Sequence, residues 1–465
     1  MGDRDMGDRI EARYWIETAF PLDAAAATMA GEQSTGTFIR VAGETDELRE
    51  RFAARVEQIV ELGEVQRASL PGSGMPKSGS GMPKPGSGAP DTDIGAAKSA
   101  STDGSRSPRG TSSSSAAPPK RRVAEVTLSW PLHNLGTSLP NLLATLAGNL
   151  WELKPFSGMR LLDVRLPPTF LQAYRGPQFG VAGTRSLTGV HGRPLIGTII
   201  KPSIGLSPEA TAAQVKVLVE AGIDFIKDDE LQADGPLCPF DARVRAVMRV
   251  INAHADRTGK KVMYAANITG EIDEMLRRHD LVVAEHGTCV MVSMNSIGLP
   301  ALKVLREHAQ VAIHGHRNGW GLLGRSPAIG MSFVAYQKFW RLAGIDHTHV
   351  NGLRNKFCED DASVLASARE CLTPMFEVPG RGCEIMPVFS SGQTASQAPD
   401  TYRGLGSLDL IHAAGGGIMG HPNGVAAGVR SMREAWEAAV AGVSLDEYAR
   451  SHPDLKASLE RFSPA

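Results

Sequence analysis

The N-terminal part of the chain alternates between strand-like and helix-like patterns of apolar positions. Residues 10–16 and 123–130 place apolar side chains at alternate positions, as a half-buried strand does. Residues 46–62 and 140–153 instead repeat apolar positions at helical spacing. These segments predict a small α+β domain, which we expect to be ferredoxin-like.

From about Arg193 onward, short apolar runs rich in β-branched residues alternate with helical patterns. The runs are residues 195–200, 223–227, 262–267, 289–294, 311–316, 347–351, 385–389 and 410–414. Strands that alternate with helices eight times over roughly 240 residues predict a (β/α)8 TIM barrel. Active sites of this fold lie at the C-terminal ends of the strands, where these runs end in polar or glycine residues.

The composition changes abruptly between about residues 68 and 122. The run GSGMPK begins at Gly72 and again at Gly79, and a serine run follows at 112–115. Such a segment buries too little apolar surface to offset its conformational entropy, so we expect a disordered insert. The predicted organisation is an N-terminal domain over 8–165 with this insert inside it, a catalytic TIM barrel over 175–440 and a helical tail over 441–465.

Charge and cysteine usage exclude several classes of protein. Lys and Arg (49) nearly balance Asp and Glu (50), so no global field would attract nucleic acid or an anionic membrane. The 5 cysteines have no C-x-x-C spacing, which favours reduced thiols over disulfides or a zinc site. The N-terminus is charged and has no apolar signal h-region, and no apolar stretch is long enough to span a membrane. We therefore expect a cytoplasmic protein that binds neither nucleic acid nor membrane.

The most informative local motif is FIKDDE at residues 225–230. Side chains alternate along a strand, so Lys227 and Asp229 point into the barrel mouth, and Glu230 lies just beyond the strand end. Carboxylate oxygens suit Mg²⁺, but a lysine among acids is normally an ion-pair partner. Lys227 would supply an oxygen ligand only as a carbamate formed with CO₂. The residues alone leave open a charged strand end or a metal site.

The chain resembles the RuBisCO large subunit over roughly residues 8–66 and 123–450. The motifs that carry the resemblance stand at 32–37 (EQSTGT), 148–149 (GN), 197–202 (GTIIKP), 224–230 (DFIKDDE), 314–317 (HGHR), 346–349 (DHTH) and 415–422 (GGGIMGHP). They occur in order, and those in the barrel lie at predicted strand ends. The resemblance implies that carbamylated Lys227, Asp229 and Glu230 bind Mg²⁺. It further implies that Lys201 moves protons to or from an enediolate and that His316 relays them.

The resemblance implies two further groups of residues. One comes from the partner subunit of a homodimer with shared active sites and comprises Glu32, Thr37 and Asn149. The other grips substrate phosphates, with Arg317 and His349 at one end of the substrate and Gly415, Gly416, Ser391 and Gly392 at the other. A mobile catalytic loop would carry Lys356.

Several positions depart from the RuBisCO pattern. Ser203 stands where RuBisCO has a second lysine, Ile199 replaces a threonine, and Trp320 replaces a histidine. The loop over 354–359 (RNKFCE) lacks the glycines that flank the RuBisCO loop lysine. Gln393 replaces a glycine, so we expect its side chain to enter one phosphate anchor. Retained metal ligands and altered substrate ligands indicate the RuBisCO-like, type IV branch and a substrate with a single phosphate.

These observations favour a Mg²⁺-dependent carboxy-lyase that decarboxylates a 3-keto sugar-acid phosphate in carbohydrate catabolism. Isomerisation or enolisation of a (methylthio)ketose phosphate is the first alternative; Asn149 disfavours the methionine-salvage enolases, which have a lysine there. Carboxylation of ribulose bisphosphate is the second. A non-catalytic binding module is the third, but such a module has no reason to keep Lys201, Lys227 and both carboxylates.

Overall fold

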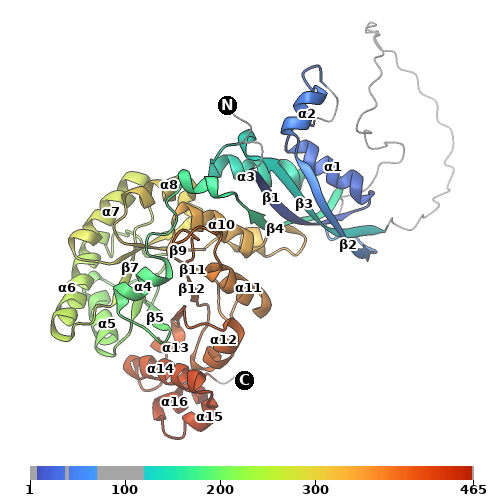
Figure 1. The fold of residues 1–465 in the computed structure, drawn as a ribbon. Coiled ribbons are helices and arrows are strands. Elements are labelled where there is room, and N and C mark those ends of the chain that lie inside the picture. Colours follow the sequence, from blue (N-terminus) through green and yellow to red (C-terminus); the bar gives the residue numbers. More distant parts are fainter. Residues whose placement is uncertain (1–7, 37–40, 71–119, 463–465) are drawn as a thin grey trace, which may run out of the picture.

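The computed structural model describes residues 8–36, 41–70 and 120–462. The predicted insert lies mostly outside the described residues, as does Thr37. Figure 1 shows a twisted sheet domain on one side of a larger barrel, with the last helices on the barrel's far end. The predicted fold class is confirmed: an N-terminal mixed sheet domain precedes an eight-stranded parallel β/α barrel.

The N-terminal sheet has the strand order β10-β4-β1-β3-β2. Its first four strands are β1 (Arg9–Thr18), β2 (Arg55–Val65), β3 (Arg121–Pro131) and β4 (Phe156–Arg165). These four pair antiparallel, with β1 in the centre, and their β-α-β-β-α-β order along the chain is ferredoxin-like. Helices α1 (Leu22–Glu32) and α3 (Leu139–Ala147) bury their apolar side chains with those of the sheet. The hydroxyl of Tyr14 donates to the carbonyl of Leu146 at 2.7 Å, which ties β1 to α3.

The fifth strand of this sheet comes from the barrel region and was not predicted from the sequence. Strand β10 (Ile329–Met331) pairs parallel with β4, and the Arg160 guanidinium donates to the carbonyl of Met331 at 2.9 Å. Three residues are too few for a periodic signal. Because the strand is short and far away in sequence, only the assembled structure gives it a partner.

Two predicted helices were partly wrong. Residues 46–62 form α2 (Asp46–Phe52) and then enter β2. The apolar positions of β2 have a spacing that also fits a helix, but β3 offers a full ladder of backbone hydrogen-bond partners, so the segment forms a strand. The helix expected over 140–153 ends at Ala147, and η2 (Asn149–Glu152) follows as a 3₁₀ turn. A Cβ on Gly148 would lie only 2.3 Å from the Ala144 carbonyl oxygen, so this turn requires glycine.

All eight predicted barrel strands are confirmed, each within two residues at either end. They are β5 (Leu195–Ile199), β6 (Phe225–Lys227), β7 (Met263–Asn267), β8 (Cys289–Ser293), β9 (Ala312–His316), β11 (His347–His349), β12 (Met386–Phe389) and β13 (Ile411–Ala413). They close a barrel in the order β11-β12-β13-β5-β6-β7-β8-β9, with parallel neighbours throughout. A buried cluster that includes Leu195, Phe225, Met263 and Ile411 packs inside it, so the mouth above has a solid floor.

Helices surround the barrel and close the chain. They are α4 (Gly180–Thr188), α5 (Pro208–Glu220), α6 (Phe240–Thr258), α7 (Ile272–Ala284), α8 (Met294–His308), α9 (Gly321–Gly324), α10 (Phe333–Ala343), α11 (Asp361–Leu372), α12 (Ala398–Leu405), α13 (Gly416–Met419), α14 (Val425–Ala441), α15 (Leu445–Tyr448) and α16 (Pro453–Arg461). Fully buried Leu455 and an ion pair between Arg430 and Asp454 (2.7 Å) hold α16 to α14. Within the described ranges, each helix is too short or too polar to cross a bilayer.

Candidate active site

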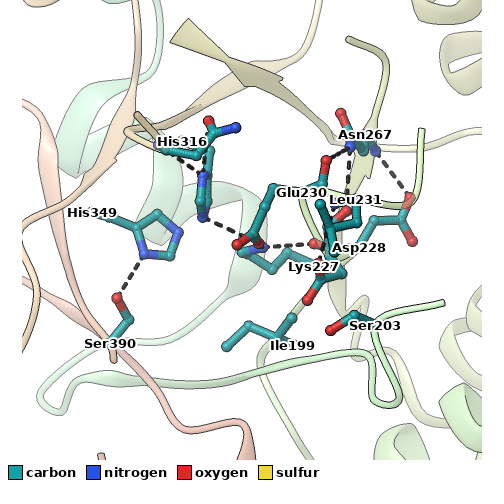
Figure 2. Close-up of polar contacts among 12 residues, drawn as sticks. Ile199, Ser203, Lys227, Asp228, Glu230, Leu231, Asn267, His316, His349 and Ser390 are labelled. Carbon is teal, nitrogen blue, oxygen red and sulfur yellow. Dashed lines mark hydrogen bonds and ion pairs between the residues drawn. The ribbon is translucent and has the colours of Figure 1, made fainter. Parts of the chain in front are cut away.

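Strand β6 ends in the predicted metal-binding residues. The side chain of Lys227 is buried; its amine donates to the Asp228 carbonyl at 2.7 Å and lies 3.7 Å from a Glu230 carboxylate oxygen (Figure 2). Burial lowers the pKa of Lys227, although the neighbouring carboxylates oppose this shift. A lowered pKa increases the share of neutral amine, which is the form that reacts with CO₂.

A second layer of hydrogen bonds fixes this strand end. The buried Asp228 carboxylate accepts from the Tyr264 hydroxyl (2.6 Å), the Asn267 backbone N–H (3.0 Å) and the Arg243 guanidinium (3.2 Å). The Asn267 side-chain amide also donates to the carbonyls of Asp229 and Glu230, at 3.2 and 3.3 Å. Sequence reasoning placed Asn267 at a strand end but assigned none of these positioning roles, because they depend on which strands are neighbours.

Lys201 extends from the end of β5 to the same carboxylates. Its amine lies 2.5 Å from Asp229 and donates to the Ser203 hydroxyl at 2.9 Å. Burial alone would raise the pKa of Asp229, but the hydrogen bond and charge of Lys201 outweigh it, and the pKa falls below its usual value. Ser203, which removes a positive charge relative to RuBisCO, thus serves as a hydrogen-bond partner that orients Lys201.

His316 at the end of β9 and His349 at the end of β11 lie on the side of Glu230 away from Asp228 and Asn267 (Figure 2). His316 Nε2 is 3.5 Å from the Glu230 carboxylate, and burial lowers the pKa of His316 to about 4. His349 bonds Ser390 through Nδ1 (2.7 Å) and His314 through Nε2 (2.8 Å), and burial holds its pKa well below the usual value. Both imidazoles are therefore neutral near pH 7, and His349 uses both ring nitrogens within the protein.

Arg317 is brought next to a carboxylate that sequence reasoning missed. Its buried guanidinium donates through Nη2 to Glu359 at 2.5 Å and stacks over the ring of Phe333 at 4.4 Å. The Asn351 amide donates to the same Glu359 oxygen at 2.7 Å, and the Ser391 hydroxyl donates to Asn351 at 2.8 Å. The departure of the loop over 354–359 from the RuBisCO sequence was the signal from which sequence reasoning could have found this contact.

The phosphate site predicted at the glycines after β13 has free space beside Gly415 and Gly416 in the described structure. A Cβ on Gly416 would meet nothing within 4 Å, and one on Gly415 would reach only Ile199 and Lys201, at 3.7 Å each. Gly392 lies beside Lys356, whose backbone N–H donates to the Ser391 carbonyl at 3.1 Å; the Lys356 side chain is exposed.

The expectation that Gln393 fills this anchor was wrong. Its side chain is buried against Gly352, and its amide donates to the Leu353 carbonyl at 3.1 Å. The side chain turns toward the loop that follows β11 because that loop offers both space beside a glycine and a carbonyl acceptor.

Glu32 and Asn149 are not brought to the barrel mouth within one chain. Glu32 ends α1 and Asn149 begins η2, both exposed in the sheet domain, and α1 lies well away from the barrel (Figure 1). Their predicted role therefore requires a second subunit. Thr37, the third residue of this group, lies outside the described residues.

A second group of potential metal ligands comprises His279, Asp280 and His308 on α7 and α8. The backbone N–H of Gln310 donates to His279 Nε2 (3.1 Å), so the ring proton sits on Nδ1, which faces Asp280 at 3.0 Å. His279 therefore offers no lone pair to a metal ion, and the β6 strand end is the better metal site.

Comparisons with known proteins agree with this geometry. Residues 180–462 match the family described as ribulose bisphosphate carboxylase large chain, catalytic domain, and residues 10–70 and 113–170 match its N-terminal domain. The chain belongs to the RuBisCO large-chain family. Within that family it is a RuBisCO-like enzyme, as its motifs predicted.

Three relatives illustrate the likeness. A 3-oxo-isoapionate-4-phosphate transcarboxylase/hydrolase of Xanthobacter autotrophicus is 53% identical over 454 residues, covering 98% of this chain and 99% of the relative. A 3-oxo-isoapionate-4-phosphate decarboxylase of Rhizobium etli is 42% identical over 456 residues, covering 98% and 99%. The crystal structure of a rubisco-like protein from Burkholderia fungorum is 43% identical with a TM-score of 0.83, covering 98% of this chain and 100% of that one.

Proposed function

We propose that the chain cleaves the carboxylate from a 3-oxo sugar acid that carries one phosphate, as a cytoplasmic decarboxylase of carbohydrate catabolism. The observation that carries the proposal is the Lys201 amine, held 2.5 Å from Asp229 beside Lys227 and Glu230. It provides a proton donor directly beside the predicted metal-binding carboxylates. The names of the Xanthobacter and Rhizobium relatives support a 3-oxo acid with a phosphate on C4 as the substrate.

The chemistry of a 3-oxo acid suits these residues. Its ketone is β to the carboxylate, so when the C1–C2 bond breaks, the electron pair moves into the C2–C3 bond and onto the ketone oxygen. CO₂ leaves, and the remaining enolate must receive a proton at C2. Lys201 is the donor that we assign to this step, with Ser203 and Asp229 holding its ammonium group in place. Neutral His316 would exchange a proton with a substrate hydroxyl.

The donor set fits a magnesium ion. Lys227, once carbamylated, would hold it together with Asp229 and Glu230, and these hard oxygen donors leave positions for water and substrate. The buried amine with a lowered pKa favours the carbamate. When bound, Mg²⁺ would polarise the ketone and stabilise the negative charge that develops on its oxygen.

We further propose a homodimer whose active sites are completed by Glu32, Asn149 and Thr37 of the second copy. Glu32 and Asn149 are exposed and lie in the sheet domain, and helix α1, which Glu32 ends, lies well away from the barrel. An exposed position leaves them available to a neighbouring barrel.

Transfer of the carboxyl group is a second candidate, which the name of the Xanthobacter relative favours. One experiment separates the two outcomes: 3-oxo-isoapionate 4-phosphate labelled with ¹³C at C1 is incubated with enzyme, Mg²⁺ and bicarbonate and followed by NMR. We expect the label in CO₂ and bicarbonate. Label recovered in an organic acid would establish transfer instead, and an unchanged or merely isomerised substrate would refute both. Ribulose bisphosphate should give no carboxylated product.

A further inference from the structure

A polar network of two buried and two half-buried side chains crosses three neighbouring strand ends on one side of the barrel mouth. It runs from Arg317 after β9 through Glu359 to Asn351 after β11, and from there to Ser391 after β12. The strands β9, β11 and β12 are adjacent in the barrel, so the network forms a continuous wall. The charges of Arg317 and Glu359 cancel within it, and this wall therefore carries no net positive charge.

The hydrogen-bond donors of this wall are largely committed within the protein. Ser391 donates its hydroxyl proton to Asn351, so it can only accept a hydrogen bond from a ligand. His349 is neutral and has partners at both ring nitrogens. Arg317 Nη1 is buried and makes no hydrogen bond among the described residues, which leaves it as a donor without a partner here.

A neighbouring part of the mouth, formed by the glycines after β12 and β13, has the reverse character. Gly415 and Gly416 expose backbone after β13, and the stem of Lys201 lies 3.7 Å from a Cβ built on Gly415. In the part of the chain that the structure describes, the exposed Lys356, whose backbone and Cβ lie beside Gly392, forms no ion pair within 4.0 Å; its ammonium group lies 5.2 Å from the centroid of the Phe357 ring. Backbone N–H groups and an uncompensated cation suit a phosphate dianion.

We propose that Glu359 determines substrate specificity by excluding a second phosphate. The substrate's one phosphate binds at the glycine side, and its other end presents an uncharged hydroxyl group to Arg317. That hydroxyl accepts a hydrogen bond from Arg317 Nη1 and donates to Glu359 or Ser391. A phosphate dianion there would face the Glu359 carboxylate without a compensating cation. This assignment rests on the proposed function, because it concerns the same site.

The wild-type enzyme tests the assignment with two ligands that differ by one phosphate. Ribulose 1-phosphate and ribulose 1,5-bisphosphate are titrated by calorimetry in the presence of Mg²⁺ and bicarbonate. We expect the monophosphate to bind at least as tightly as the bisphosphate. A bisphosphate that binds tenfold more tightly, or a failure of the monophosphate to bind, would overturn the assignment.

Two variants complete the test. Glu359→Gln keeps an acceptor oxygen for Arg317 but removes the negative charge, and should shift the affinity ratio toward the bisphosphate by roughly tenfold, the value of one charge-assisted contact. Asp360→Asn removes the adjacent charge while preserving the cap of α11, and should leave the ratio unchanged. An unchanged ratio in Glu359→Gln refutes the role of Glu359; if that variant does not fold, the wild-type ratio decides.

The proposed reaction stands or falls on a separate measurement. An absence of turnover of the labelled 3-oxo acid together with the expected ratio would refute the reaction and support the specificity assignment. Turnover together with tighter binding of the bisphosphate would support the reaction and refute the specificity assignment.

Discussion

Replacing the buried Arg243 of α6 should destabilise the protein far more than replacing an exposed arginine. The Arg243 side chain is fully buried and donates to the Asp228 carboxylate (3.2 Å) and to the carbonyls of Cys238 (3.0 Å), Gln232 (3.2 Å) and Ala233 (2.7 Å). Burial would lower its pKa, but Asp228 raises the pKa above its usual value, so the guanidinium stays charged. It therefore compensates a buried carboxylate and fixes the loop that follows Glu230.

The magnitude follows from what Arg243→Met leaves behind. Methionine fills part of the stem but leaves Asp228 buried without its cation, and removing one partner of a buried ion pair costs about 3–5 kcal/mol. Asp228 keeps its hydrogen bonds from Tyr264 and Asn267, so we expect the lower end, about 3 kcal/mol. This is a large part of the roughly 5–15 kcal/mol that stabilises a typical protein.

Urea unfolding followed by tryptophan fluorescence measures this loss, with Arg277→Met as the matched control. Arg277 pairs with Asp241 at 2.9 Å, but the two side chains are 49% and 46% exposed, and such pairs contribute at most about 1 kcal/mol. Because the Arg243 loop follows Glu230, Mg²⁺ affinity should also fall by about tenfold in Arg243→Met and stay constant in the control. A stability loss within 1 kcal/mol of the control would refute this reasoning.

Three further predictions concern the metal, the assembly and acid stability. Lys227→Met should fold normally but lose both Mg²⁺ binding and activity. In the wild type, calorimetry should detect Mg²⁺ binding only when bicarbonate is present. Binding of Mg²⁺ in CO₂-free buffer would exclude a carbamate. Mixing inactive Lys201→Ala and Asn149→Ala proteins should restore some activity, whereas an active wild-type monomer in sedimentation would exclude shared sites. Burial would raise the pKa of Asp224, but the charges and hydrogen bonds of Arg193 and Lys260 outweigh burial and lower the pKa. Its stabilisation is therefore complete above a carboxyl's usual pKa, about 4, and is lost as the pH falls through the lowered value. Unfolding free energies of Asp224→Asn should show a flatter acid limb, and an unchanged limb would contradict this.

The barrel could be predicted from sequence because each of its strands is a local signal. A short apolar run that ends in polar or glycine residues defines a buried parallel strand without knowledge of its neighbours. Strand β2 shows the limit of this reasoning: its apolar positions fit a helix equally well, and its pairing with β3 decides the outcome. Strand β10 shows the same limit, since its partner β4 lies far away in sequence.

By itself, the sequence determined the family, the barrel and the approach of Lys227, Asp229 and Glu230 to one another, because strand periodicity places them together. It also indicated a single substrate phosphate and assigned the loss of the other to Gln393, whose side chain packs against Gly352 instead. Only the tertiary structure decided that the Gln393 side chain turns away and that Glu359 neutralises Arg317. A side chain's target depends on which acceptors and charges the neighbouring loops present, and these loops meet only when the barrel closes.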